Sequence, residues 1–481
     1  MLAFILSSVL FFLFFLRNNM ERWLGWQPPG PLNLPLMGSC VSLLKTGKNV
    51  FREPHLAMSK LSQIYGNIMS VGLGSDTWVI LSGFDEIREF SMKSEATSRP
   101  SMPALIELYA FNEQLGVIFA DGRLWRDQRR FMSKALKEIQ SSYKPFGEQI
   151  MDEFNLFLAF LDNKQHHVFN GRDFFDIATL NIIWRLAAGE RFDYENKRSQ
   201  EMITHIESFT MEESLTILVG VSYARYLPYF RGIFQGMQEH MGKFHQFLWK
   251  IVAKPTDEHE VTYKNLFQHQ LGKGGDFFTQ KQLVISMLDF FTGGSGTLSK
   301  TLSFCILFMI QDEEMQGKIR EEAQRFEEVS FEHLKQMPFT EAFISEVQRW
   351  ASILPISPPR EVTSSVNVAG FPLKVGQKVQ MSLFAMHRDP QHWKDPQNFR
   401  PDRFLDPNNG SFVPDEWLQP FGYGKRKCLG EQIARQTVFL FLANLVKHFS
   451  FKAVEELPSL DPIGGLTLAP QQFKFKIMPI L

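Results

Sequence analysis

The sequence predicts a mainly α-helical chain with small β-sheets, and two observations carry this prediction. Apolar side chains recur at three- and four-residue spacing through residues 146–248, 282–310 and 433–446, which is the periodicity of helices that bury one face. Residues 68–71 and 78–81 are short apolar runs separated by glycines, which is typical of two strands joined in a hairpin. Helices are therefore expected to supply most of the core.

Composition narrows the class of protein. The chain has 481 residues and a net charge of −1, so no bulk electrostatic attraction to nucleic acid is expected. Its three cysteines give no disulfide framework, which fits a reducing compartment. The 47 phenylalanines are enough to line a large apolar core or pocket.

The N-terminus predicts attachment to a membrane. Residues 2–16 are almost wholly apolar, although a helix of that length is only about 22 Å long, short of a bilayer core of about 27–30 Å. Arg17 and Arg22 follow the apolar run and no small-residue cleavage site is evident. This order favours an uncleaved anchor, with the rest of the chain in the cytosol, over a cleaved signal peptide. The prediction is an anchor at residues 1–22 and a stiff proline-rich hinge at residues 23–38.

The most informative motif is FGYGKRKCLG, at residues 421–430. A thiolate that binds a metal must be open to the metal on one side and shielded from water elsewhere. Gly422 and Gly424 let the backbone approach a flat cofactor, and the helix expected after Gly430 places partial positive charge near the sulfur. Haem iron held by one cysteine thiolate is a known outcome of such a site. The simpler alternative is a buried cysteine beside a glycine turn.

This motif resembles the Phe-x-x-Gly-x-x-x-Cys-x-Gly pattern of the cytochrome P-450 (haem-thiolate monooxygenase) family, of the animal microsomal type, an arthropod member being one option. The fixed positions are filled by Phe421, Gly424, Cys428 and Gly430. The resemblance implies that these residues bind haem b, that Cys428 is the iron ligand and a catalytic residue, and that Arg426 contacts a haem propionate. It also implies the P-450 fold, with the haem between a long central helix and the cysteine loop, and a single catalytic haem domain over residues 39–481.

A second stretch, residues 116–131, holds Trp125 and Arg129 four positions apart. On a helix they share one face and direct an indole N–H and a guanidinium at one anion. Without further context a solvated basic face is the ordinary interpretation. The resemblance implies that this pair, and Arg360 from another segment, bind haem propionates. The neighbouring cations form an expected basic surface that attracts an acidic electron donor, comprising Arg123, Arg126, Arg130, Lys425 and Lys427.

Two adjacent glycines, Gly293 and Gly294, interrupt the apolar helix expected at residues 282–310. Each glycine costs a helix about 1 kcal/mol relative to alanine. The pair therefore predicts that something flat packs against the helix or that the helix opens locally. With Thr297 it matches the family's central-helix pattern, Ala/Gly-Gly-x-Asp/Glu-Thr-Thr/Ser. The resemblance implies that the Thr297 hydroxyl is catalytic and helps to deliver protons for the use of dioxygen.

This pattern is broken at two positions. Gly296 stands where the family has an acid that relays protons, and Leu298 stands where it has a second hydroxyl residue. Protons must then take another route, through water in the space beside Gly296 or through Ser295.

Glu346 and Arg349 lie three residues apart in an expected helix, and such a pair is usually an exposed salt bridge of small value. Arg403 lies where the family has a third partner. The resemblance implies a buried structural network of these three side chains under the haem. It also assigns substrate contacts to seven positions, namely Ile118, Phe119, Gly293, Ile356, Pro358, Val362 and Leu466.

Together these features predict an enzyme that inserts one oxygen atom of O2 into a lipophilic substrate by hydroxylation or epoxidation. The resemblance implies electrons from an NADPH-dependent flavoprotein reductase, with cytochrome b5 as a further candidate partner. No NADPH or flavin site is evident in the chain itself. The expected location is the endoplasmic reticulum membrane, with the catalytic domain in the cytosol. Two alternatives stay open: O2-independent rearrangement or dehydration of an oxygenated lipid, which Gly296 motivates, and a non-catalytic haem or lipid binder.

Overall fold

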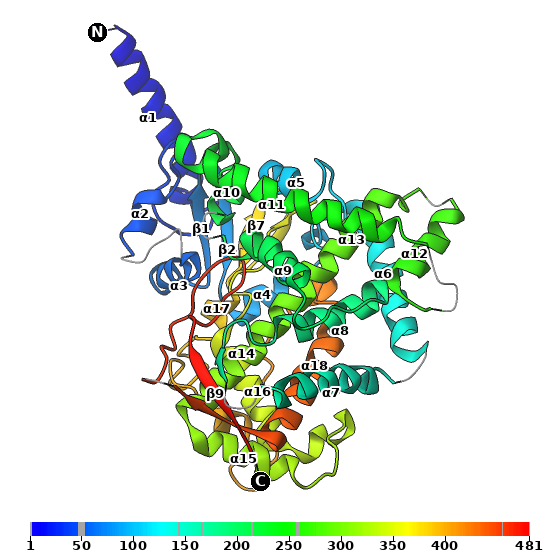
Figure 1. Ribbon diagram of the computed structural model, residues 1–481. Helices are drawn as coiled ribbons and strands as arrows, with labels where there is room; N and C mark the ends of the chain where they lie inside the picture. Colours follow the sequence, from blue (N-terminus) through cyan, green and yellow to red (C-terminus); the bar gives the residue numbers. More distant parts are fainter. Residues whose placement is uncertain are drawn as a thin grey trace.

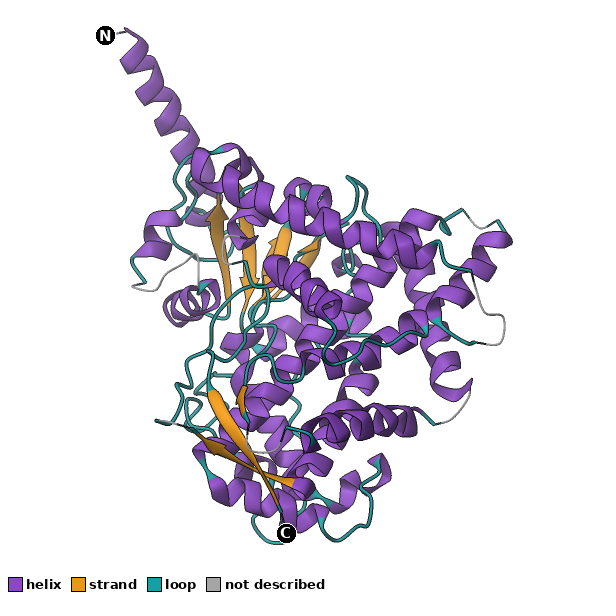
Figure 2. Ribbon diagram, viewed as in Figure 1, coloured by secondary structure: helices purple, strands orange, loops and turns teal. Residues whose placement is uncertain are grey.

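Helices make up most of the computed structural model, and the strands gather in small sheets (Figures 1 and 2). The structure describes residues 2–46, 53–142, 145–164, 167–212, 215–255, 260–274, 276–454 and 456–480. The α-helices are α1 (Leu2–Trp23), α2 (Cys40–Leu44), α3 (Pro54–Tyr65), α4 (Phe84–Met92), α5 (Pro103–Tyr109), α6 (Gly122–Ser142), α7 (Phe146–Asp162), α8 (Asp176–Ala188), α9 (Lys197–Thr210), α10 (Leu215–Gly220), α11 (Pro228–Val252), α12 (Tyr263–Gly272), α13 (Gln280–Phe290), α14 (Gly296–Gln311), α15 (Glu313–Ala323), α16 (Pro338–Ala351), α17 (Leu383–Met386) and α18 (Glu431–His448). The mainly α architecture predicted from the sequence is confirmed.

The strands form three small sheets. They are β1 (Ile68–Leu73), β2 (Asp76–Leu81), β3 (Val168–Asn170), β4 (Arg360–Glu361), β5 (Val366–Val368), β6 (Phe371–Leu373), β7 (Lys378–Met381), β8 (Phe449–Ala453) and β9 (Lys474–Pro479). The predicted hairpin is confirmed as β1 and β2, with Ile68 opposite Leu81. β7 runs parallel to β2 and β4 completes a four-stranded sheet, which fixes Arg360 at its edge. The other sheets are β3-β9-β8 and β5-β6.

The central helix is α13 and α14 joined by a single π-helical stretch, η3 (Phe291–Ser295). Gly293 and Gly294 lie within this stretch, so the local opening predicted from the two glycines is confirmed. A β-carbon added at Gly294 would lie 2.9 Å from the Ile183 side chain on α8, so close packing of α8 requires glycine there. π-Helical segments inside α-helices are frequent at functional sites.

Helix α18 begins directly after Gly430, as the apolar periodicity predicts, and nearly all of its residues from 437 to 446 are buried. It packs against α14 and α7. The central helix and α18 therefore form the core beside which residues 421–430 are held.

Helix α1 projects away from the rest of the chain (Figure 1). Its last turn is tied to the globule, because Arg22 Nε donates to Ser70 Oγ at 2.9 Å and Ser70 N donates to Pro29 O at 2.8 Å. The proline-rich segment is thus pinned against β1 by hydrogen bonds. Among the residues described, we find no helix with both the length and the apolar character needed to cross a membrane.

Glu346, Arg349 and Arg403 meet in a buried ion-pair network. The fully buried Arg349 guanidinium donates two hydrogen bonds of 2.7 Å to the fully buried Glu346 carboxylate, and Arg403 Nε lies 3.1 Å from it. Arg349 also donates to the carbonyls of His387 and Pro396 at 2.9 Å. The network thereby fastens α16 to the segment that leads towards the cysteine loop.

His387 extends this network to the loop itself. Burial, with help from Arg349 and Arg388, lowers the pKa of His387 to about 3, so the ring is neutral. Its Nε2 accepts a hydrogen bond of 3.1 Å from Gln419 N. The ring therefore joins the ion-pair network to the residues just before Phe421.

Replacing Arg349 by methionine should strongly destabilise the protein. The Glu346 carboxylate would lose its main partner while staying buried, and this typically costs about 3–5 kcal/mol. Urea unfolding of the haem-loaded protein, followed by circular dichroism, measures the change. The matched control is K243M, because Lys243 and Glu239 form an exposed helical pair, 52% and 68% accessible, worth about 0–1 kcal/mol. Equal losses in both variants would contradict a structural role for the buried network.

Candidate active site

A cavity of ≈ 360 Å³ is lined by both the central helix and residues 419–430. Apolar side chains make most of its wall, and α6 contributes Met132 and Leu136 to it. Its size falls in the range of about 300–1,000 Å³ that is usual for sites of small molecules and cofactors. The cavity therefore has the dimensions and the character of a site for a large apolar group.

Cys428 opens into this cavity. Its backbone N donates to Phe421 O at 2.9 Å, which closes the loop, and Gly430 follows at the start of α18. The side chain has accessible surface, but this surface lines the cavity and not the outside of the protein. The thiol is therefore open to a group inside the cavity and shielded from bulk water.

The surroundings of Cys428 act on its thiol in two directions. Burial raises its pKa, while the backbone N–H of Gly430 and the cations Arg129 and Lys427 oppose this rise by stabilising the thiolate. A coordinated metal ion removes the thiol proton outright. Burial alone therefore keeps the thiol neutral, and the hydrogen bond and the cations favour the thiolate that a metal would bind.

Four arginines concentrate positive charge on the same cavity, namely Arg99, Arg129, Arg360 and Arg426. Burial lowers the pKa of all four, and repulsion from neighbouring guanidinium groups adds to this for Arg99, Arg360 and Arg426. Arginine nevertheless stays charged in proteins. In the described part of the chain, Asp121 is the one carboxylate within ion-pair distance of any of them, 3.5 Å from Arg426. The cluster therefore has excess positive charge, most of which a dianionic ligand would offset.

Unpartnered polar atoms lie in the same cluster. Arg360 Nε and Trp125 Nε1 are buried and have no hydrogen-bond partner among the described residues. The Arg426 guanidinium lies 3.7 Å from the centre of the Trp125 ring, and Arg129 Nη2 donates to Lys427 O at 2.5 Å. Trp125 does not itself line the cavity. A haem, with one thiolate-bound iron and two propionates, fits the thiol, the spare donors and the charge of this site.

Gly422 and Gly424, the two glycines before Cys428, differ in what surrounds them. Both have left-handed φ values, +74° at Gly422 and +72° at Gly424. Gly422 lines the cavity, and nothing else would contact a β-carbon there. Gly424 does not line the cavity, and a β-carbon would clash with the backbone oxygen of Ser91. Glycine at position 424 therefore permits close packing of α4 against the loop, and a contact between Gly424 and the cofactor stays a prediction.

Thr297 lines the cavity two residues after the π-helical stretch. Its hydroxyl donates back to Gly293 O at 3.0 Å and lies 3.3 Å from Gly294 O. The oxygen lone pairs stay free to accept a proton donor. The hydroxyl is thus placed to pass a proton into the cavity.

The predicted substrate contacts divide into two groups. The five that line the cavity are Ile118, Phe119, Gly293, Pro358 and Leu466. Ile356 and Val362 do not line it, and their contact with substrate stays a prediction. Ile356 bridges to Ser382 and packs beside β2, and Val362 is fully buried in the cluster around β7. Both side chains pack into apolar clusters beside the four-stranded sheet.

Motif reading missed two residues of this site. Arg99 donates to Ile118 O at 3.0 Å and to Pro358 O at 2.8 Å, so it ties together two segments of the cavity wall. Asp289 accepts hydrogen bonds from the N–H groups of Val117 and Ile118, and burial raises its pKa to about 7. The sequence held one signal for Asp289, because an acidic residue within an apolar helix indicates a buried carboxyl group with a specific role. Nothing local marks Arg99 as buried.

Comparison with known proteins agrees with this geometry. A family model described as Cytochrome P450 matches residues 28–477. The farnesoate epoxidase of Bombyx mori is 31% identical over 502 residues, covering 100% of this chain and 99% of that protein. Cytochrome P450 2J3 of Rattus norvegicus is 31% identical (94% and 91% covered), and cytochrome P450 2U1 of Homo sapiens is 30% identical (94% and 89% covered).

The chain belongs to the cytochrome P450 family. It is a monooxygenase, hence an oxidoreductase, whose cofactor is haem b and whose electrons come from NADPH through a reductase. The resemblance predicted from the motifs is confirmed.

Replacing Cys428 by histidine should abolish the thiolate signature in the absorption spectrum of the carbon monoxide complex. Imidazole would then replace the thiol of Cys428, the one cysteine among the described residues that line the cavity. The other two cysteines supply controls, because Cys305 is buried within α14 and Cys40 lies at the start of α2. C305A and C40A should keep the signature. Its survival in C428H would disprove the assignment of the iron ligand.

Replacing Trp125 by phenylalanine should weaken haem retention. The ring stacked on Arg426 would remain, but the N–H would be lost, and a hydrogen bond to a charged group is worth about 1.5–3 kcal/mol. Haem release to an excess of an acceptor protein should accelerate by about 10-fold or more. W78F is the matched control, because the Trp78 N–H is also buried without a partner but lies away from the cavity. Equal release rates in W125F and the unmodified protein would exclude Trp125 as a propionate ligand.

Proposed function

We propose that this enzyme inserts one oxygen atom of O2 into a C–H or C=C bond of a lipophilic substrate, giving a hydroxylated or epoxidised product. The observation that carries the proposal is the cavity itself. Cys428 and Thr297 both face one large, mostly apolar space. A substrate held there is desolvated by apolar contacts, which supply most of its binding energy.

The proposed cofactor ligands follow from the same cavity. Cys428 holds the iron of haem b, and Arg129, Arg360, Arg426 and Trp125 hold its propionates. Phe421 and Gly430 shape the loop around the sulfur. When bound there, haem would supply the chemistry of dioxygen activation, with two electrons from the reductase.

The chain's own residues bind substrate and move protons. Ile118, Phe119, Gly293, Pro358 and Leu466 border the substrate in this proposal. Thr297 passes protons at its hydroxyl oxygen, from which one hydrogen bond runs back to Gly293. Apolar walls keep bulk water from the reacting atoms.

The proposed partners are the flavoprotein reductase and, as a second donor, cytochrome b5. Arg123, Arg126, Arg130 and Lys425 are exposed near the cysteine loop, and such a basic surface favours an acidic donor. The proposed location is the endoplasmic reticulum membrane. α1 supports it with exposed apolar side chains, namely Val9, Phe12, Leu13 and Phe14.

Mass spectrometry of reaction products tests this function. The purified protein, a microsomal reductase and a panel of lipids would be incubated with and without NADPH. The panel includes farnesoate, which the name of the Bombyx mori relative gives as its substrate. Products heavier by one oxygen, formed only with NADPH and not by C428H, are expected.

Other outcomes separate the alternatives. Products formed without NADPH and without added oxygen would show rearrangement or dehydration of an oxygenated lipid. A haem that no reductase can reduce would show a binding protein. Fragment spectra of the expected product distinguish an epoxide from an alcohol.

A further inference from the structure

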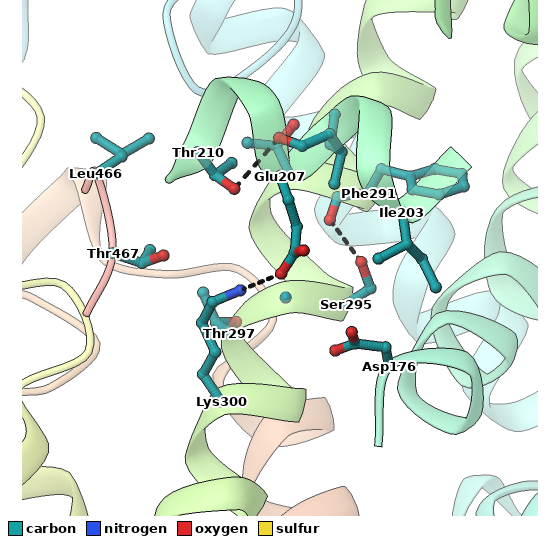
Figure 3. Close-up of a pocket in the computed structure, with 13 residues that line it drawn as sticks. Asp176, Ile203, Glu207, Thr210, Phe291, Ser295, Thr297, Lys300, Leu466 and Thr467 are labelled. Atoms are coloured by element: carbon teal, nitrogen blue, oxygen red, sulfur yellow. Dashed lines mark hydrogen bonds and ion pairs between the residues drawn. The ribbon is translucent and has the colours of Figure 1, made fainter. Parts of the chain in front are cut away.

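A second, smaller cavity lies beside Gly296, at the position where the central helix lacks the family's acid (Figure 3). It is lined by residues of α8, α9 and the central helix. Its volume of ≈ 30 Å³ exceeds the about 10–15 Å³ that one water molecule requires. The side chains that converge on it include Asp176, Glu207 and Lys300.

Lys300 folds back over Gly296. The whole Lys300 residue is only 2% exposed, and its ammonium nitrogen would lie 3.5 Å from a β-carbon at position 296. It lies 3.4 Å from the Glu207 carboxylate of α9. The absence of a side chain at position 296 thus leaves room for a cation, and this cation brings a carboxylate of another helix to the central helix.

Asp176 completes the group from the start of α8. Its carboxylate accepts a hydrogen bond of 2.5 Å from Ser299 Oγ. Carboxylate oxygens of Asp173, Asp176 and Glu207 all lie within 4.8 Å of one another. Arg172 pairs with Asp173 at 3.1 Å and Lys300 pairs with Glu207 at 3.4 Å, so neither cation is paired with Asp176. Ionisation of Asp176 beside two other carboxylates is disfavoured, because like charges this close repel one another.

The charged groups that face Asp176 are Glu207 and Asp173, which favour its protonated form, and Lys300, which opposes it. Burial is the largest effect, and together these effects raise the pKa of Asp176 to about 7. A group with this pKa both holds and releases a proton near neutral pH, as a proton donor must.

The small cavity lies between Thr297 and carboxylates that are partly exposed to solvent. Thr292, Thr297, Leu466 and Thr467 line both this cavity and the large one, so Thr297 has access to both. On the outer side, the side chains of Asp173 and Glu207 are 37% and 26% exposed. Protons can therefore enter from solvent at Asp173 or Glu207 and reach Thr297 from Asp176 through water in the cavity.

We propose that Asp176, held by Glu207, Lys300 and Ser299, is the proton donor that replaces the missing acid of the central helix and supplies the Thr297 hydroxyl. This inference rests on the proposed use of dioxygen. Oxygen insertion consumes one O2, two electrons and two protons, and yields the oxygenated product and one water. Each proton leaves Asp176, passes to Thr297 and is replaced from solvent, so the group ends each turnover as it began.

The first measurement needs no turnover. Infrared difference spectra of the resting holoenzyme across pH should contain a protonated-carboxyl band that disappears as pH rises through about 7. The isosteric variant D176N, which keeps an acceptor for Ser299, should lack this band. Asp289, whose pKa is also raised to about 7, should give a second band that persists in D176N. Persistence of both bands would overturn the assignment of Asp176.

The second measurement follows the fate of dioxygen with the reductase. Peroxide release consumes two electrons and two protons per O2, whereas complete reduction to water consumes four of each. In the wild type, the peroxide fraction should rise as pH passes about 7 and Asp176 loses its proton. A general acid typically contributes about 10²–10⁴-fold in rate, so product or water formation in D176N should fall at least about 10-fold. The remaining flux should appear as peroxide and lose this pH dependence.

Three further variants make the test specific. E207Q should show a smaller shift to peroxide, and E201Q, an exposed acid on the same helix, should show none. G296D in the D176N background restores an acid beside Lys300 and should recover coupling. Unchanged peroxide fractions in D176N, or no recovery with G296D, would overturn the proposal. If the wild type oxygenates no lipid but D176N still shifts water formation to peroxide, the proton route stands and the proposed substrate chemistry fails.

Discussion

Concentrated positive charge around a buried cavity is the constraint on which this site depends. Arg99, Arg129, Arg360 and Arg426 come from four separate segments, and Asp121 alone among the described carboxylates pairs with one of them. Burying unpaired cations is costly. The carbonyls that accept their hydrogen bonds, such as Ile118 O and Tyr423 O, offset part of that cost. The two carboxylates of a haem would offset most of the remaining charge.

The same arginines organise the backbone around the cavity. Arg99 ties the wall at Ile118 to Pro358, and Arg129 ties α6 to Lys427, the residue before Cys428. On the other side of the loop, His387 links it to the buried ion-pair network. The position of the Cys428 sulfur is therefore fixed from several directions. Such support is what keeps a metal ligand in place before the metal arrives.

The central helix shows how one change in sequence is compensated in space. Gly296 removes an acid, and the space beside it is crossed by Lys300, which is paired with Glu207. The π-helical stretch and the contact of Gly294 with α8 bring Asp176 to the same place. The family pattern has a carboxylate on the central helix, whereas here the nearby carboxylates, Asp176 and Glu207, come from α8 and α9.

Local sequence patterns predicted those features of the structure that are formed by residues close together in the chain. The cysteine loop, the hairpin and the opening at Gly293 were all legible from spacing. Contacts between distant segments were not. Ile356 and Val362 match motif positions, but the motif did not show that their side chains pack into apolar clusters beside the sheet. It also did not show that Ser91 lies close to Gly424.

Buried charges were hardest to read from the sequence, because burial is a property of the whole fold. No local sequence pattern identifies Arg99 as buried, and no motif includes Asp176, an acidic residue at the start of a helix. Their roles emerge only once α8, α9 and the central helix are brought together. Pairing of charged side chains on different helices could therefore not be predicted from this sequence.

A crystal structure of the haem-loaded protein is the most direct test of the central claim. We expect the Cys428 sulfur on the iron, and both propionates within hydrogen-bond distance of Arg129, Arg360 and Arg426. The Trp125 N–H should point at one of them. An iron bound by another side chain, or propionates directed away from the arginines, would contradict the claim that this charge cluster is built to hold the haem.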